Sequence, residues 1–250
     1  MVSVTVDVDG EAGLADGGRG FGARLSSRSE RAYGVRRGLP RVLGVLARFG
    51  VTGTFYVPGV IAQSHRDEIT AVVAAGHELG HHGHTHRRPD TLSVAEQHAE
   101  LTDGLAALRE LAGGPVRGYR APGWELTPVT LAGLGALGFT HDSSLMGDDR
   151  PYRIRSGAHS LIELPVHWSL DDAPHFAHST DPAGLLAVWQ SELRHARDEQ
   201  RHLTLTLHPE ILGRPHRLDV LTRILHELQA THTTTLTHTQ AAAAGVPDAA

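Results

Sequence analysis

The stretch Val4-Thr5-Val6-Asp7-Val8-Asp9-Gly10-Glu11 alternates apolar and polar side chains and then stops at a glycine. This alternation, which begins at Val2, predicts a β-strand that ends at a functional loop. Residues two apart in a strand point to the same face, so the carboxylates of Asp7 and Asp9 are expected to face the same side of the sheet. This pair of carboxylates is the first candidate for chemistry in the chain.

A second stretch, Gly80-His81-His82-Gly83-His84-Thr85-His86, places four imidazoles within seven residues. His82 and His86 stand in a His-x3-His relation, which suits a divalent transition metal, whereas His81 and His84 are expected outside the ligand set. A catalytic metal also needs a third protein ligand and an open position for water. We therefore expect one aspartate of the first stretch to complete the site and the other to transfer a proton. The alternative is a polar surface loop in a chain that has 19 histidines.

Strand-like and helix-like segments alternate along the chain, which predicts an α/β fold with a mostly parallel sheet, closed or nearly closed into a barrel. The expected helices are 39–49, 64–75, 93–111, 127–137, 181–199 and 218–229, and the expected strands after the first are 54–57, 78–79, 116–119, 139–141, 161–166 and 203–207. The segments Glu11 to Arg37 and Met146 to Arg155 are expected to be loops that close over a small substrate.

Polar side chains follow directly on the carboxyl ends of the predicted strands. In a parallel barrel these ends meet on one face, which is where such folds place their chemistry. Residues that are distant in sequence are thus expected to be neighbours in space. They are Asp7, Asp9, His82, His86, Arg120, Asp142, Asp171 and His208.

The composition of the chain excludes some classes of function. The chain has 250 residues, a net charge of -5 and no cysteine, which excludes thiolate chemistry and gives no reason to expect nucleic acid or a membrane as partner. We find no signal peptide and no apolar run long enough to span a membrane, so a cytoplasmic protein is expected. A single domain over residues 1–239 is expected, followed by a disordered alanine-rich tail over 240–250.

With these motifs the chain resembles the NodB-type polysaccharide deacetylase family, also described as carbohydrate esterase 4-like, over roughly residues 2 to 235. Val6 to Gly10 resembles the aspartate motif of the family and His82 to His86 its metal-binding histidines. Arg120 to Gly123 resembles the Arg-x-Pro motif, Leu205 to His208 the closing Leu-x-Leu-His motif, and Trp168 to Asp172 lies where an Asp/Trp motif is expected. The resemblance implies a distorted (β/α) barrel and metal-dependent hydrolysis of amide C–N bonds.

Two departures from the family pattern indicate a subgroup. Val8 separates the two aspartates, and Gly83 stands where many members have Ser or Thr. Both features resemble a cytoplasmic subgroup that contains cyclic imide hydrolases, ureide hydrolases and proteins labelled peptidoglycan deacetylases. Members of this subgroup often assemble as symmetric oligomers, so a homo-oligomer is a further expectation.

The resemblance assigns Asp9, His82 and His86 to one divalent metal, which suits Zn²⁺ and also Co²⁺, Ni²⁺, Mn²⁺ or Fe²⁺. Asp7 is then the general base, and Arg120 is expected to pair with it and hold it ionised.

His208 is the expected general acid, because amide nitrogen is a poor leaving group and imidazole donates a proton near neutral pH. Asp171 or Asp172 is expected to orient its ring, and the sequence does not decide between them. Both are also assigned to the substrate site, together with Trp124, Trp168 and His216. An aromatic residue at such a place contributes to packing nearly as often as to binding.

The leading prediction is a metal-dependent hydrolase that removes an N-acyl group from a small or sugar-type molecule. The alternative is the opening of a cyclic imide or ureide ring. A further alternative is a metal-free, non-catalytic binding module on the same barrel.

Overall fold

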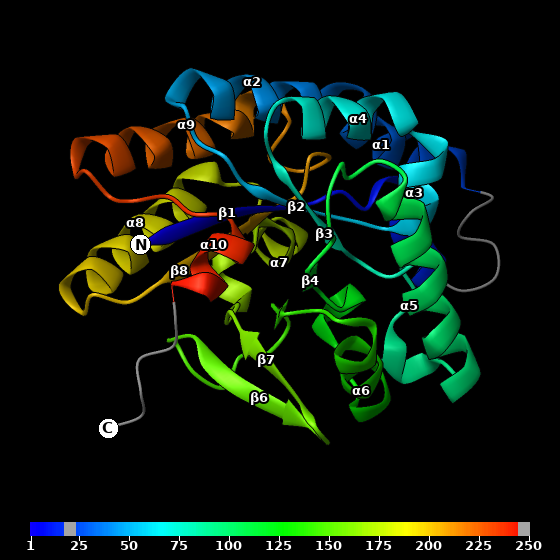
Figure 1. The fold of residues 1–250 in the computed structure, drawn as a ribbon. Coiled ribbons are helices and arrows are strands. Elements are labelled where there is room, and N and C mark those ends of the chain that lie inside the picture. The colour runs from blue at the N-terminus through cyan, green and yellow to red at the C-terminus, as the bar shows by residue number, and fades with distance from the viewer. Residues whose placement is uncertain (18–23, 245–250) are drawn as a thin grey trace.

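A curled sheet forms the centre of the protein, and helices cover its outer side (Figure 1). The computed structural model describes residues 1–17 and 24–244. Within them the strand order is β6-β7-β5-β4-β3-β2-β1-β8, and every pair is parallel except β6 with β7. The strands are β1 (Val2–Asp7), β2 (Thr54–Val57), β3 (Glu78–His81), β4 (Gly118–Tyr119), β5 (His141–Asp142), β6 (Tyr152–Ser156), β7 (His159–Glu163) and β8 (Leu203–Leu207).

The two ends of the sheet approach each other. An isolated parallel bridge joins Asp171, which follows β7, to Thr206 of β8. The predicted mostly parallel and nearly closed barrel is therefore confirmed, and the carboxyl ends of the parallel strands gather on one face.

The helices largely begin and end where the sequence places them. A capping box of Ser93 and Glu96 begins α5, Asp181 caps α8, and Gly50 ends α2 in the left-handed conformation that glycine adopts most readily. The helices are α1 (Leu25–Tyr33), α2 (Leu39–Phe49), α3 (Gly59–Ser64), α4 (Arg66–Ala74), α5 (Val94–Arg109), α6 (Pro128–Leu137), α7 (Asp172–His178), α8 (Pro182–Asp198), α9 (Pro215–Ala230) and α10 (His238–Ala243).

Three expectations from the sequence are corrected. The expected loop from Glu11 to Arg37 contains a 3-10 helix, η1 (Gly10–Gly17), then α1 and a π-helical segment, η3 (Gly34–Gly38), that continues into α2. Residues 18–23 of that segment lie outside the described residues. In α1 only Ala32 is buried, so no apolar periodicity marks this helix in the sequence.

The other two corrections concern segments rich in charge or alanine. Residues 152–155 of the expected loop 146–155 belong to β6, which pairs with β7 in a largely exposed hairpin. Residues 240–243 of the expected tail belong to α10, which begins with a capping box of Thr237 and Gln240 and buries His238. Residues 245–250 lie outside the described residues, and the extent of the domain stays a prediction.

Strand β1 is buried on both faces. Its valines belong to the hydrophobic core, with Leu39 and Val42 of α2 in the same cluster. Its polar residues take part in hydrogen bonds to β8 and to the residue before it: Ser3 Oγ lies 2.9 Å from His202 Nε2, and Thr5 Oγ1 lies 3.1 Å from Thr206 Oγ1. The alternation of the sequence therefore separates an apolar outer face from a polar inner face.

Uncharged histidines fill the part of the barrel interior beneath the site. The rings of His141 and His202 lie 6.1 and 6.2 Å from that of His238, which pairs with the hydroxyl of Tyr56 at 2.6 Å. Burial lowers the pKa of His141 and of His202 to about 4 and that of His238 well below its ordinary value. These rings are therefore neutral at pH 7 and act as hydrogen-bonding core residues.

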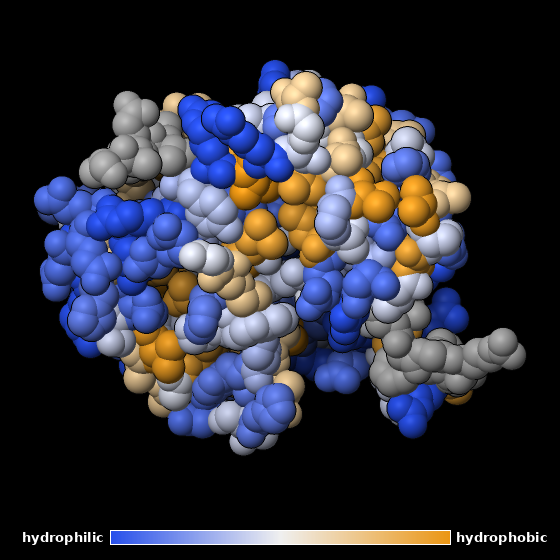
Figure 2. Space-filling view, turned by 90° about the horizontal axis from the view of Figure 1, so that it is seen from below, coloured by the Kyte–Doolittle hydropathy of each residue, from blue (hydrophilic) through white to orange (hydrophobic). Residues whose placement is uncertain are grey.

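The outer surface mixes polar and apolar side chains. Seen from below, hydrophobic residues reach the surface in patches between hydrophilic ones (Figure 2). Among the described helices, none has the length and apolar character needed to cross a membrane.

Asp142 of β5 and Glu163 of β7 are aligned in the parallel ladder, and both are buried. Glu163 Oε1 accepts the backbone N–H groups of Ser144 and Leu145 at 3.0 Å, and Asp142 Oδ1 accepts the Ser144 hydroxyl. Burial and the mutual repulsion of the two carboxyls raise the pKa of Glu163 well above its ordinary value, and burial raises the pKa of Asp142 to about 6. The pair therefore retains a proton that the unfolded chain releases.

Replacing Glu163 with Gln is expected to reduce the pH dependence of stability. The pKa values of Asp142 and Glu163 are higher in the folded protein than in the unfolded chain, where they are near 4. The stabilisation that the bound proton gives the folded state is therefore complete at low pH, and it is lost as the pH rises from about 4 through about 6 and above. The free energy of unfolding of the wild type relative to E163Q should fall over that range in urea titrations. The exposed Glu125→Gln serves as the control, and equal pH profiles for wild type and E163Q would contradict the shared proton.

Candidate metal centre and active site

Asp9, His82 and His86 converge at the carboxyl ends of β1 and β3. Asp9 Oδ1 lies 3.5 Å from His82 Nε2 and 3.3 Å from His86 Nε2. The three residues are at most 9% exposed, and one ligand atom from each falls within 4.8 Å of the others. The structure thus brings together the three residues that the sequence assigns to a metal.

The orientation of these groups fits a cation. The backbone carbonyl of Arg120 lies 2.7 Å from His82 Nδ1, so that nitrogen donates its hydrogen and the lone pair of Nε2 faces the cluster. Asp9 Oδ1 is buried and has no hydrogen-bond partner among the described residues. Burial by itself favours the neutral acid, but the neighbouring imidazoles of His86 and His82 hold the pKa of Asp9 well below its ordinary value. A buried carboxylate oxygen that has no hydrogen-bond partner and lies beside two imidazole nitrogens is costly without a cation, so the donor set fits a divalent metal.

The histidine loop owes its shape to left-handed backbone and to a buried glutamate. Gly83 has φ 71° and His86 has φ 62°, and a non-glycine residue in this region is typical of functional sites. Glu100 of α5 accepts the backbone N–H groups of His84 and Thr85 at 2.7 Å, so the loop is tied to a helix behind it. Because the backbone is held at both points, His86 returns to within reach of His82.

His81 and His84 lie outside the cluster, as the sequence predicts. His81 Nε2 lies 3.1 Å from the carbonyl of Leu101, and burial lowers the pKa of His81 to about 3. His84 lies against Gly59 of α3, where an added Cβ would approach its ring to 2.4 Å. Both rings therefore support the loop.

Arg120 holds Asp7 beside the cluster. The guanidinium is fully buried and donates to Asp7 Oδ1 at 2.7 Å, to Thr5 Oγ1 at 2.9 Å, and to the carbonyl and hydroxyl of Ser143 at 3.0 and 2.9 Å. The other carboxylate oxygen of Asp7 lies 3.9 Å from His82 Nε2. The predicted pair of Arg120 and Asp7 is present, and it aims one oxygen of Asp7 at the cluster.

His208 is held by Asp172. Asp172 Oδ1 lies 2.7 Å from His208 Nδ1, and both carboxylate oxygens accept the His208 backbone N–H at 3.0 and 3.1 Å. Asp171 lies farther away, at 3.5 Å from the same ring nitrogen, and caps α7 through the N–H of Ala173. The choice that the sequence leaves open thus falls on Asp172, and the burial of both carboxyls suits a supporting role behind the histidine.

The surroundings of His208 favour the charged form of its ring. Burial by itself lowers its pKa, but the negative charges of Asp171 and Asp172 outweigh burial and raise the pKa well above its ordinary value. Its other nitrogen, Nε2, lies 3.7 Å from Asp9 Oδ2. A charged donor therefore faces the same space as the candidate metal ligands.

Two tryptophans form a stacked pair on the loops after β4 and β7. The rings of Trp124 and Trp168 lie 4.6 Å apart and nearly parallel, with Trp168 45% exposed and Trp124 buried. His216 instead lies in the first turn of α9 and lines a surface pocket with Asp181 and Pro182 at the start of α8. The predicted contact of these three residues with substrate stays a prediction.

Arg31 and Glu210 also reach the site, and the sequence alone does not identify them. Arg31 Nη1 lies 2.5 Å from Glu210 Oε1 and 3.8 Å from Asp9 Oδ2. Glu210 is two residues beyond His208, a position that could have marked it. Arg31 lies in a segment without apolar periodicity, so the sequence carries no signal for it.

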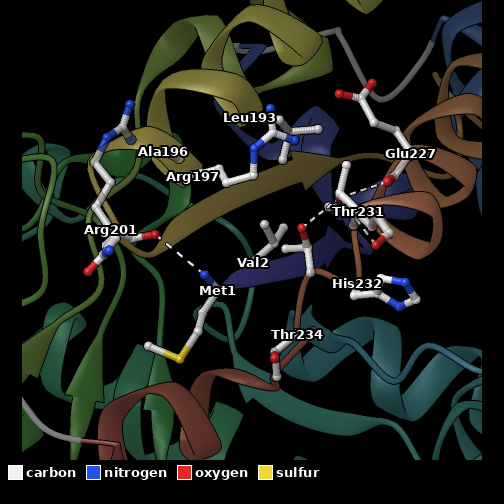
Figure 3. A pocket seen from close by; sticks show the side chains of 13 residues that line it. Met1, Val2, Leu193, Ala196, Arg197, Arg201, Glu227, Thr231, His232 and Thr234 are labelled. Carbon is white, nitrogen blue, oxygen red and sulfur yellow. Dashed lines mark hydrogen bonds between the residues drawn. The ribbon is translucent and has the colours of Figure 1, made fainter.

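A separate pocket of about 340 Å³ lies at the opposite end of the barrel. It is lined by Met1 and Val2 at the start of β1 and by residues of α8 and α9 (Figure 3). The backbone carbonyl of Arg201 accepts a hydrogen bond from the amino group of Met1 there. Among the described residues that line it, Glu227 is the only carboxylate, so this end of the barrel offers no comparable set of metal ligands.

Comparison with known proteins finds relatives that span most of the chain. The family described as "Polysaccharide deacetylase" matches residues 32–141. A Mycobacterium smegmatis protein assigned to the polysaccharide deacetylases is 38% identical, and its crystal structure superposes with a TM-score of 0.90 over 97% of this chain and 88% of that one. The peptidoglycan deacetylase of Helicobacter pylori is 25% identical over 91% of this chain and 89% of its own length. A crystal structure of an allantoinase, 21% identical over 97% of this chain and 88% of its own, shares the fold with a TM-score of 0.84.

The chain belongs to the polysaccharide deacetylase family. It is accordingly a hydrolase, as the resemblance of its motifs implies.

Replacing Arg120 with Lys is expected to lower the free energy of unfolding by about 2–4 kcal/mol. An ammonium cannot reach Asp7, Thr5 and Ser143 together, so buried acceptors are left without a donor. Urea denaturation measures the loss. The exposed Arg109→Lys on α5 should stay within about 0.5 kcal/mol of wild type, and an equally small effect of R120K would show that the buried network contributes little.

Proposed function

We propose that this chain is a metal-dependent hydrolase that removes an N-acyl group from a non-peptide amide. The observation that supports it most is the convergence of five side chains at one end of the barrel: Asp7, Asp9, His82, His86 and His208. Amide hydrolysis of this kind requires metal ligands, a base and a charged acid whose side chains face the same space.

Asp9, His82 and His86 would hold the metal, and one carboxylate with two imidazoles suits Zn²⁺ and also Co²⁺, Ni²⁺, Mn²⁺ or Fe²⁺. When bound, such a cation lowers the pKa of a coordinated water and polarises the carbonyl of the substrate. His82 is kept in the right tautomer by the carbonyl of Arg120.

Asp7 is the proposed general base. Arg120 occupies one of its carboxylate oxygens at 2.7 Å and keeps the group ionised and fixed, while the other oxygen is aimed at the cluster. That oxygen takes a proton from the attacking water, and the water oxygen forms the new bond to the acyl carbon.

His208 is the proposed general acid. It begins the reaction protonated, because Asp171 and Asp172 raise its pKa, and its Nε2 faces the site. When the C–N bond breaks, this nitrogen gives its proton to the departing amine, and the acyl group leaves as a carboxylic acid. Asp172 then stabilises the neutral ring through Nδ1.

N-deacylation is the first choice of reaction because the Helicobacter pylori relative, similar over most of both chains, is a peptidoglycan deacetylase. Opening of a cyclic imide or ureide is the second. The observation that favours it is the guanidinium of Arg31 of α1, which lies 3.8 Å from Asp9 Oδ2 and can donate hydrogen bonds to the carbonyl oxygens of a small ring. The same base and acid serve both reactions.

The purified protein is expected to contain close to one divalent metal ion per chain. His82→Ala and His86→Ala should each weaken metal binding at least about tenfold, because a ligand is lost. Elemental analysis measures the metal content. His98→Ala, at an exposed histidine of α5, is the control and should keep the metal, while full occupancy in both ligand variants would refute this site.

Hydrolysis of an N-acetylated amino sugar, dihydrouracil and succinimide in parallel separates the two reactions. We expect metal-dependent turnover of at least one of them, followed by release of acetate or by opening of the ring. The Asp7→Asn variant should lose at least about a hundredfold in kcat, which is the usual contribution of a general base. Absence of turnover of all three with metal bound would contradict both candidate reactions.

A further inference from the structure

The segment α1–η3–α2 is fixed against the loop that follows β8. An added Cβ at Gly38 would lie 1.9 Å from the carbonyl oxygen of Pro209, and one at Gly213 would lie 2.2 Å from the same oxygen. At Gly34 an added Cβ would lie 2.8 Å from Glu210 Oε2. Three glycines thus allow the helical segment to touch the loop that carries His208, and the contact is rigid because two backbones meet.

This contact brings Arg31 to the metal cluster. Its guanidinium is anchored by Glu210, which is buried, and reaches within 3.8 Å of Asp9 Oδ2. The Arg31 side chain is nevertheless 31% exposed, so it can be reached from outside. Among the described residues, the one hydrogen bond of Arg31 uses Nη1, and the remaining N–H groups of its planar fork donate to none of them.

The surroundings of Arg31 are strongly basic. Residues 24–48 contain seven arginines, no lysine and one acidic residue, Glu30, in a chain whose net charge is -5. A cleft between η1 and α1 begins at Glu11, two residues after Asp9, and is lined by Arg28, Arg36 and Arg37. The positive field that these arginines produce around Arg31 attracts anions and repels cations.

We infer that the substrate carries a carboxylate or similar anionic group and that Arg31 is the specificity-determining residue that binds it. This inference rests on the proposed function, since it names the substrate class of the same site. Arg31 supplies a planar fork that matches a carboxylate, and Glu210 fixes its position through Nη1. The reacting amide then lies between Asp7 and His208 while the anion is held at the wall formed by α1.

Binding of unreactive pairs that differ by one carboxylate tests this directly. The pairs are glucosamine with muramic acid, and uracil with orotate, measured by titration calorimetry on the metal-loaded protein. Wild type is expected to bind an anionic member more tightly than its neutral partner. Arg31→Gln should reduce that preference about ten- to a hundredfold, as expected for a charge-assisted hydrogen bond, and leave binding of the neutral member nearly unchanged.

Two further variants separate recognition from folding. Arg31→Lys keeps the charge but loses the fork, so it should retain part of the preference, even if Arg31→Gln is too unstable to measure. Arg109→Gln, an exposed arginine of α5, should behave as wild type. A wild type that does not prefer either anionic member, or a preference unchanged in both Arg31 variants, would overturn the inference.

Hydrolysis of N-acetylglucosamine, N-acetylmuramic acid, dihydrouracil and dihydroorotate distinguishes this result from the proposed function. Binding that prefers the anion without any turnover would contradict the reaction and leave the role of Arg31 intact. Turnover with equal kcat/KM for neutral and anionic members, unchanged by Arg31→Gln, would contradict the role of Arg31 and leave the reaction intact.

Discussion

The buried guanidinium of Arg120 is the interaction on which the site depends. A charge without solvent exposure is tolerated only when its hydrogen-bonding groups are satisfied, and Arg120 meets this requirement through Thr5 and Asp7 of β1 and Ser143 directly after β5. Its own backbone carbonyl also orients His82. One residue thus fixes the proposed base and a proposed metal ligand, so the geometry of the two is coupled.

A second buried pair, Asp172 and His208, fixes the position of the proposed acid. Asp172 binds both the backbone and the ring of His208, and the short distances leave the ring little freedom. Asp7 and His208 are therefore each held from behind by an oppositely charged group. In both cases the proposed catalytic side chain presents one atom toward the cluster, which is the arrangement that general acid and base chemistry needs.

Much of this arrangement could be predicted from sequence because it lies on strong local patterns. The alternation of β1 and the spacing of His82 and His86 are short-range signals, and parallel topology then places the strand ends together. The choice between Asp171 and Asp172 could not be made, since neighbouring carboxyls look alike until the turn between them is known. The role of Arg31 could not be predicted from the sequence for a different reason. Helix α1 buries little apolar surface, so its sequence has no periodic pattern. The position of Arg31 at the site depends on the close tertiary contacts that Gly38 and Gly213 make.

The most direct test of the account is to locate the metal by anomalous X-ray scattering from crystals of the zinc-loaded protein. The account predicts one strong peak within bonding distance of Asp9 Oδ1, His82 Nε2 and His86 Nε2, about 2.0–2.2 Å from each. A peak elsewhere, or none at this cluster in crystals that contain stoichiometric zinc, would contradict it.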